Sequence, residues 1–150
     1  MSELRDLYQE LILDHGRHPR NFKLLEGATC SADGHNPLCG DRLQLRLVCE
    51  HDKIVDIGFQ GSGCAICMAS ASTMSEAVKG QTRQEAQELF QHFVGLVVHG
   101  KLDEVNALPP KLRAFSGVGE FPMRVKCATL SWHTLDAALA GQAKASSEEK

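Results

Sequence analysis

Hydrophobic residues near the start of the chain recur at the spacing of one helical face. They follow the i, i+3, i+4, i+7, i+8 pattern and comprise Leu4, Leu7, Tyr8, Leu11 and Ile12. This period places them along one side of an α-helix, and Gly16 is a typical stop signal. The chain is therefore predicted to begin with an amphipathic helix.

Two stretches in the first half of the chain alternate between apolar and polar residues. They cover residues 43–48 and 55–59, and the polar segment 50–53 separates them. A period of two is typical of strands with one buried face, and the short polar connection favours a β-hairpin. Upstream, residues 30–41 are rich in Gly, Asn, Asp and Pro, which favour turns. That segment is predicted to be mainly loop, with part of it able to pair as a short strand.

The middle of the chain returns to helical patterns. Residues 64–79 are mostly small, have good helix propensity and follow the tight turn 61–63. Thr82 and Glu85 have the spacing of a capping box, ahead of an apolar helical face that continues to Gly100. Two helices are therefore predicted here, the first directly after a strand and a turn.

The last third of the chain is predicted to hold one connection and one helix. Residues 106–123 contain a Pro-Pro pair and several glycines, so at most a short helix is expected. Apolar residues on one face predict a final helix that ends at Gly141, followed by a flexible polar tail over 143–150. Strands come early and helices late. The predicted fold is one α+β domain over residues 1–150, a small antiparallel three-stranded sheet with helices packed on one face.

The length and the net charge of the chain limit the role that a metal can have and the kinds of molecule that the protein can bind. A chain of 150 residues can bury a core without cross-links, so a metal would serve chemistry rather than folding. The net charge of -3 and the pI near 6.1 provide no basic stripe for a nucleic-acid backbone. No apolar run approaches the roughly 20 residues of a membrane span, and the first residues do not resemble a secretory signal. We therefore expect a cytoplasmic protein without nucleic-acid or membrane partners.

Cysteine is the residue type with the strongest chemical signal in this chain. The cysteines occupy positions 30, 39, 49, 64, 67 and 127. In the reducing cytosol, cysteines more often indicate metal or sulfur chemistry than disulfides. The alternative for any one of them is a small buried apolar residue, and we assign this structural role to Cys30 and Cys49.

Three of the cysteines and one aspartate form a candidate metal site. Cys39 and Asp41 flank a glycine, which lets the backbone turn sharply enough for both side chains to face one ion. Cys64 lies at a predicted helix start and Cys127 near the start of the final helix, where the helix dipole favours thiolate over thiol. Thiolates combined with a carboxylate suit tetrahedral Zn²⁺. The predicted ligands are Cys39, Asp41, Cys64 and Cys127.

Two further residues bear on this site. Three thiolates, one carboxylate and a divalent ion would leave net negative charge, which a nearby cation can offset. Arg124 lies one helical turn before Cys127 and is the candidate for this role, an ordinary solvated arginine being the alternative. Cys67, three residues after Cys64, is an alternative to Asp41 as the fourth ligand.

Each of the three ligand cysteines stands in a longer motif. The motifs are Asn36-Pro37-Leu38-Cys39-Gly40-Asp41, Gly61-Ser62-Gly63-Cys64-Ala65-Ile66 and Arg124-Val125-Lys126-Cys127-Ala128-Thr129-Leu130. Together they resemble the IscU/NifU-like family, in its SufU-type branch, and the resemblance extends from the first helix to about Leu139. Two departures favour that branch over the scaffold proteins. Lys126 stands where the scaffolds carry a His, and the stretch between Cys64 and Cys127 is longer.

The resemblance implies a role in iron–sulfur cluster assembly and an IscU/SufU-like fold. It implies that a SufS-like, pyridoxal-phosphate-dependent cysteine desulfurase passes persulfide sulfur to Cys39, after a desulfurase His has replaced Cys39 on the zinc. Asp41, Cys64 and Cys127 would remain ligands, Arg124 would give electrostatic support, and downstream scaffold or acceptor proteins would receive the sulfur. The chain would be at most a zinc-dependent sulfurtransferase. A docking role for two histidines, His15 and His18, rests on the resemblance alone.

The same residues are also compatible with two other functions. One is a scaffold that assembles and transfers a transient [2Fe–2S] cluster on Cys39, Cys64 and Cys127. The other is a structural zinc domain, in which loss of one ligand would remove fold and function together.

Overall fold

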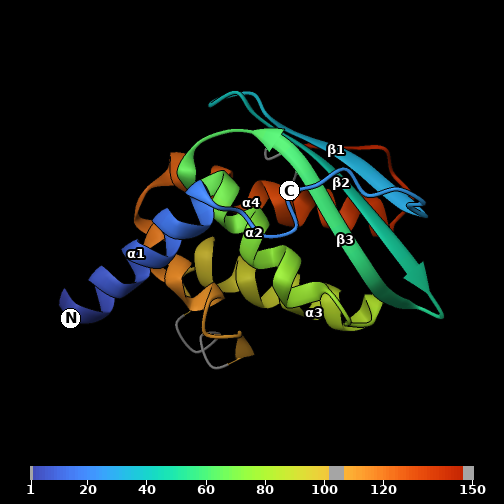
Figure 1. Cartoon of the computed structure of the whole chain (residues 1–150). Coiled ribbons are helices and arrows are strands. Elements are labelled where there is room, and N and C mark those ends of the chain that lie inside the picture. The colour runs from blue at the N-terminus through green and yellow to red at the C-terminus, as the bar shows by residue number, and fades with distance from the viewer. Residues whose placement is uncertain (1, 102–106, 147–150) are drawn as a thin grey trace.

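The computed structural model describes residues 2–101 and 107–146, with side chains from residue 6 onward, and it confirms the α+β class (Figure 1). In chain order the elements are α1 (Ser2–Arg17), β1 (Cys30–Asn36), β2 (Asp41–Glu50), β3 (Lys53–Ser62), α2 (Ala65–Val78), α3 (Arg83–Val97), the 3₁₀ helix η2 (Leu112–Glu120), α4 (Pro122–Leu139) and β4 (Lys144–Ser146). Within the described residues, no helix combines the length and the apolar character that crossing a membrane requires.

The sheet contains the predicted antiparallel hairpin and extends it on one side. Its strand order is β3-β2-β1-β4, and β2 pairs antiparallel with both β3 and β1. Strand β1 occupies residues predicted to be mainly loop, and its register runs from Cys30 opposite Leu47 to Asn36 opposite Asp41. Its residues have weak strand propensity, so the pairing depends on the edge that the strongly alternating β2 offers.

The prediction of a flexible tail over 143–150 is wrong for residues 144–146, and residues 147–150 lie outside the described part. Strand β4 runs parallel to β1, with Gly34 opposite Ala145, and the Asp33 amide donates to the Ala143 carbonyl at 2.8 Å. Ala145 is buried. This strand has no hydrophobic alternation of its own to detect, and it forms because β1 leaves unpaired backbone groups at the edge of the sheet.

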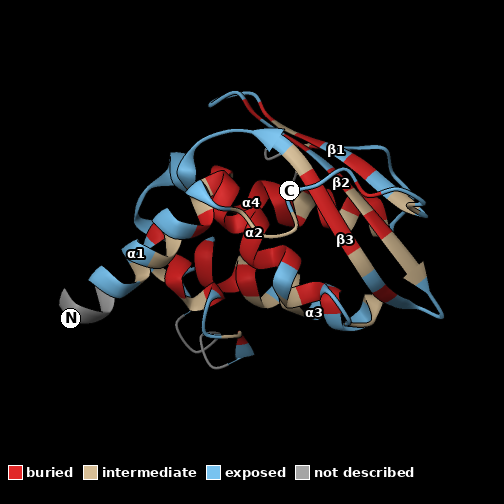
Figure 2. Cartoon of the chain, in the orientation of Figure 1, coloured by how far each residue is buried: buried red, intermediate tan, exposed pale blue. Residues whose placement is uncertain are grey.

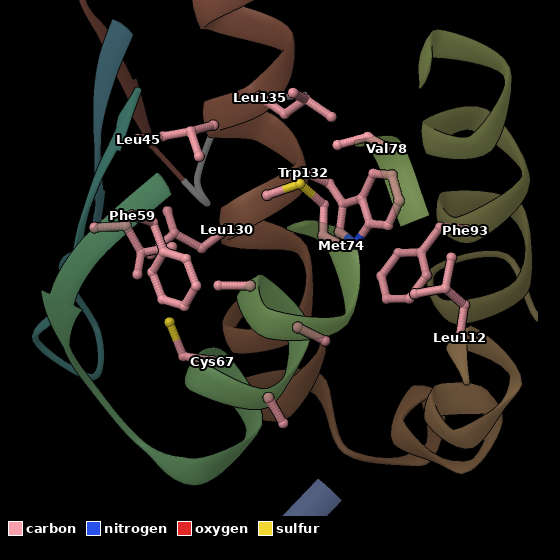
Figure 3. Close-up of a cluster of buried hydrophobic side chains, with 14 of the residues drawn as sticks. Leu45, Phe59, Cys67, Met74, Val78, Phe93, Leu112, Leu130, Trp132 and Leu135 are labelled. Carbon is pink, nitrogen blue, oxygen red and sulfur yellow. The ribbon is translucent and has the colours of Figure 1, made fainter. Parts of the chain in front are cut away.

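The helices pack on one side of the sheet, and α2 and α4 are buried along most of their length (Figures 1 and 2). Figure 3 shows the cluster between these layers, where Phe59 of β3 faces Leu130 of α4 and Trp132 lies between Met74 of α2 and Phe93 of α3. The small residues of α2 explain its position, because short side chains allow close approach of neighbouring helices and strands. The Ser70 hydroxyl of α2 donates to the Ala128 carbonyl of α4.

The predicted helix boundaries agree closely with the structure. The capping box is confirmed, because the Thr82 amide donates to Glu85 Oε1 at 2.9 Å and the Glu85 amide donates to Thr82 Oγ1 at 3.1 Å. The connection predicted over 106–123 contains η2, a nine-residue 3₁₀ helix. Residue 106 of that connection and the side chain of Leu4 lie outside the described part.

A buried histidine joins α1 to α2. His15 is 2% exposed, its Nδ1 lies 2.7 Å from Ser72 Oγ, and its Nε2 lies 3.9 Å from Glu76 Oε1. Burial lowers the pKa of His15 below its ordinary value, and the positive charges of Arg20 and Lys111 act in the same direction. His15 therefore holds these helices together as a neutral ring.

We expect acid to destabilise the protein through His15. The unfolded chain, in which the imidazole pKa is near 6.5, binds this proton more readily than the folded chain, so stability falls as the pH drops below about 6.5 and levels off below the folded pKa. Urea midpoints at about pH 7.5 and about pH 5.5 measure the effect. The His15→Gln variant should show a smaller difference between the two midpoints, whereas an unchanged difference would assign the acid sensitivity to other groups.

Candidate metal centre

The turn between β1 and β2 presents two of the predicted ligands. Gly40 has a φ of +74°, which favours glycine, and its amide donates to the Asn36 carbonyl at 2.8 Å to close the turn. Cys39 is exposed at the tip, whereas Asp41, the first residue of β2, is fully buried. The local sequence therefore places a reachable thiol and a buried carboxylate on one short turn.

The fold brings a third donor from α4 to this turn. One sulfur each of Cys39 and Cys127 and one carboxylate oxygen of Asp41 all lie within 4.8 Å of one another. A tetrahedral ion with Zn–S bonds of about 2.3 Å holds its ligand atoms roughly 3.5–4 Å apart, so small side-chain adjustments would bring these atoms onto one ion. Two sulfurs and a carboxylate are also the donor types that Zn²⁺ accepts, so the residues present fit this metal.

Neighbouring groups fix the Asp41 carboxylate. Asn36 Nδ2 donates to Asp41 Oδ2 at 3.0 Å, and the Cys64 amide donates to Asp41 Oδ1 at 3.0 Å. A Cβ at Gly63 would lie 2.6 Å from Oδ1, so this position has room only for glycine. A carboxylate held in this way is oriented before any ion arrives, which is the usual arrangement around protein-bound metals.

Cys64 borders the three-residue group without belonging to it. It is the N-cap of α2, where its sulfur accepts the Cys67 amide at 3.4 Å, and it is exposed. Its side chain also contacts the Cys127 thiol. Capping occupies the sulfur and accounts for its place outside the group of atoms within 4.8 Å.

The environment of Cys127 differs from the one predicted. The helix dipole was expected to favour its thiolate, but Cys127 lies in the second turn of α4 and is 3% exposed. Burial raises the pKa of the Cys127 thiol, and contacts with Asp41 and Cys64 raise it further. The dipole effect fades beyond the first turn, so burial dominates. A bound cation would supply the positive charge that this cluster lacks.

The other predicted residues lie around the centre or outside it. The side chain of Cys67 is fully buried in the core, close to Phe59 (Figure 3). Arg124 is exposed on the first turn of α4, with its guanidinium 4.7 Å from the centre of the Phe121 ring. His15 and His18, whose docking role is an expectation from resemblance, lie at the end of α1 and just after it.

Asn36 is a site residue that the sequence analysis did not assign. Its side-chain amide is fully buried and donates to Asp41 at 3.0 Å and to the sulfur of Cys127 at 3.5 Å. It thereby links the β1–β2 turn to α4. Its position three residues before Cys39 was visible, but only the folded structure shows that one amide reaches two distant ligands.

Comparison with known proteins places these features in a family. Residues 7–147 match the model of the NifU-like N terminal domain. The chain is 38% identical over 139 residues to the zinc-dependent sulfurtransferase SufU of Bacillus subtilis, covering 93% of each chain. It is 36% identical over 145 residues to the iron–sulfur cluster assembly scaffold protein IscU of Streptococcus pyogenes, covering 97% of this chain and 90% of that one.

A solved structure supports the same placement. The crystal structure of a putative iron–sulfur cluster assembly scaffold protein for the SUF system from Fervidobacterium islandicum is 39% identical. It superposes with a TM-score of 0.81, covering 87% of this chain and 94% of that one. The chain therefore belongs to the family of NifU-like N-terminal domains and has SufU-type and IscU-type proteins of iron–sulfur cluster assembly as its relatives.

Proposed function

We propose that this protein is a zinc-dependent sulfur acceptor that takes persulfide sulfur from a cysteine desulfurase on Cys39 and passes it to iron–sulfur cluster assembly. The observation that carries the proposal is the unequal exposure of the donor group. Cys39 is exposed at the tip of a turn, whereas Asp41 and Cys127 are buried beside it. A partner protein can therefore reach Cys39 while Asp41 and Cys127 stay covered. The similarity to a protein named as a zinc-dependent sulfurtransferase supports this assignment.

The transfer is a thiol–persulfide exchange at Cys39. The Cys39 thiolate attacks the outer sulfur of the desulfurase persulfide, the new S–S bond leaves a persulfide on Cys39, and the desulfurase cysteine departs as a thiolate. No net oxidation occurs. Bound zinc would keep the thiolate deprotonated and lower its nucleophilicity until the partner docks.

The remaining residues have supporting roles in this proposal. Asp41, Cys64 and Cys127 retain the zinc, with Asn36 and the Cys64 amide orienting the aspartate. Arg124, which is one turn before Cys127, offsets part of the negative charge of the ligand set.

The surface around Cys39 suits a protein donor. Three large apolar side chains on this turn and at the start of α4 are exposed by about half, namely Leu38 (54%), Phe121 (47%) and Met123 (49%). Leu38 adjoins Cys39 in the chain, and Phe121 and Met123 lie at the start of the helix that carries Cys127. Exposed apolar side chains on the elements that carry a reactive site favour docking of a macromolecule over binding of a small molecule. We propose a SufS-like, pyridoxal-phosphate-dependent desulfurase as this partner and the cytoplasm as the compartment, where reducing conditions keep the thiols free.

Sulfur transfer to Cys39 is the test. Zinc-loaded protein incubated with a SufS-type desulfurase and cysteine should gain one sulfur atom, which peptide mass spectrometry would locate on Cys39. The Cys39→Ser variant should gain none while remaining folded, and the Cys30→Ser variant, altered at the opposite end of the same hairpin, should gain it normally. Sulfur on another cysteine, or none on wild type, would overturn the acceptor role.

A scaffold function on the same ligands is the second candidate. The similarity to a protein named as an IscU scaffold favours it. It predicts that anaerobic reconstitution yields a stable, transferable [2Fe–2S] cluster on Cys39, Cys64 and Cys127. Metal analysis of natively purified protein separates the two functions, because the sulfur acceptor should contain zinc without added metal.

A further inference from the structure

Two cysteines outside the metal centre meet at the opposite end of the same hairpin. Cys30 is the first residue of β1 and Cys49 is the last residue but one of β2, whereas the turn with Cys39 and Asp41 lies at the other end. Cys30 is paired with Leu47, so Cys49 lies two residues farther along the neighbouring strand. This diagonal placement brings the thiols of Cys30 and Cys49 close enough to influence each other, and both side chains are half-buried against the core.

A positive charge adjoins one thiol of this pair. Arg83, the first residue of α3, donates from Nη2 to Cys30 Sγ at 3.6 Å. Its Nη1 donates to the Leu139 carbonyl at 2.9 Å, and its Nε lies 3.6 Å from Asp52 Oδ1, so the guanidinium is held in place from three sides. A fixed guanidinium stabilises the negative charge of a neighbouring thiolate, which is the reactive form of cysteine.

The second thiol is held in a different environment. Burial and the neighbouring Cys30 raise the pKa of Cys49, while its backbone amide donates to Thr29 Oγ1 at 2.8 Å. Cys49 therefore favours the protonated form, whereas Cys30 accepts a hydrogen bond from the guanidinium of Arg83. A nucleophilic thiolate beside a protonated thiol is the arrangement that redox-sensitive cysteine pairs use, one thiol reacting first and the other resolving the product.

We propose that Cys30 and Cys49 form a reversible redox site that hydrogen peroxide converts into a disulfide, independently of the metal centre. The Cys30 thiolate attacks a peroxide oxygen, the O–O bond breaks, and Cys30 becomes a sulfenic acid as the released hydroxide takes up a proton to give water. The Cys49 sulfur then attacks the sulfenic sulfur, and its proton leaves with the hydroxyl group as a second water. The two thiols lose two electrons in total, and the peroxide gains them.

The local backbone permits the approach that a disulfide requires. The two sulfurs must come within about 2.05 Å of each other, which diagonal positions on neighbouring strands reach only with some adjustment. The register of β2 against β3 shifts between Val48 and Cys49, and such irregularities bend and twist a strand. The disulfide would link β1 to β2, the two strands whose connecting turn carries Cys39 and Asp41. Oxidation would therefore restrict the movement of these strands without modifying a metal ligand.

Peptide mapping of oxidised protein tests the proposal. Zinc-loaded protein is treated with hydrogen peroxide, its free thiols are alkylated, and it is cleaved before aspartate without reduction. Cleavage at Asp33 and Asp41 separates Cys30, Cys39 and Cys49 into the peptides 14–32, 33–40 and 41–51. We expect peptides 14–32 and 41–51 to be joined by a disulfide that thiol reduction releases, with the zinc content unchanged.

Matched variants complete the test. Cys30→Ser and Cys49→Ser should each abolish the linked peptide. Arg83→Gln should slow its formation several-fold, and Arg83→Lys, which keeps the charge, should restore part of the rate, a rescue that a merely structural role of Arg83 does not predict. Peroxide that oxidises Cys39 while Cys30 and Cys49 both remain alkylatable would overturn the proposal, as would an unchanged rate in Arg83→Gln. The result is independent of sulfur transfer, because no desulfurase is present.

Discussion

Replacing Asp41 with alanine is expected to weaken zinc binding by at least about 100-fold, because the variant loses both a ligand and a buried negative charge. Asp41 is the only carboxylate that the described residues bring to the two sulfurs of Cys39 and Cys127. Without it, the remaining donors are thiols, one of which already caps α2. Metal content after dialysis, together with competition against a chromogenic chelator, measures the loss.

The control for this prediction is the other residue considered as fourth ligand. Cys67 is fully buried in the core, so Cys67→Ser should lower stability but keep zinc at full stoichiometry. The reverse outcome, with zinc kept in Asp41→Ala and lost in Cys67→Ser, would assign the fourth ligand to Cys67.

A second variant keeps the Asp41 experiment interpretable if the alanine variant folds poorly. Asp41→Ala leaves the Cys64 amide without its acceptor and removes one of the acceptors of the Asn36 side-chain amide, and a buried donor left unsatisfied costs about 1–3 kcal/mol. Asp41→Asn has nearly the same size and keeps one acceptor oxygen while removing the charge. We expect it to fold, as judged by far-UV circular dichroism, and still to bind zinc more weakly than wild type.

Replacing Trp132 with alanine is expected to lower the free energy of unfolding by about 3–5 kcal/mol. The Trp132 side chain is fully buried between helices. Its ring stacks on Phe93 with centroids 5.0 Å apart and an interplanar angle of 21°, and it lies 6.5 Å from the Phe90 ring. Alanine would leave a large cavity and remove both aromatic contacts. Urea unfolding followed by circular dichroism is the appropriate measurement, because Trp132 is the only tryptophan in the chain.

A phenylalanine at the same position separates the contribution of packing from that of hydrogen bonding. Trp132 Nε1 is buried and has no hydrogen-bond partner among the described residues, so removing it sacrifices no hydrogen bond. Trp132→Phe should therefore cost less than half as much as Trp132→Ala. Equal losses in the two variants would mean that the indole nitrogen, rather than the ring area, stabilises this part of the core.

Local signals in the sequence identified most elements of this fold. The period of apolar residues predicted the helices, and the Thr82–Glu85 capping box predicted the start of α3, because both depend on contacts within a few residues. Strand β1 was predicted only in part, as a short strand within a loop, and β4 was not predicted. Their residues are small or polar, and they become strands because a neighbouring strand offers unpaired amides and carbonyls.

The candidate metal centre likewise contains some residues that the sequence places together and others that only the fold brings together. The sequence by itself determined the pairing of Cys39 with Asp41, because two residues that flank a glycine on one turn cannot be far apart. Only the tertiary structure decided that Cys127 meets them, that Asn36 links both sides, and that Cys30, Cys49 and Arg83 gather at the other end of the hairpin. Contacts between residues distant in the chain depend on how α3 and α4 pack against the sheet, and that packing is set by the burial of apolar surface from the whole chain rather than by any short motif.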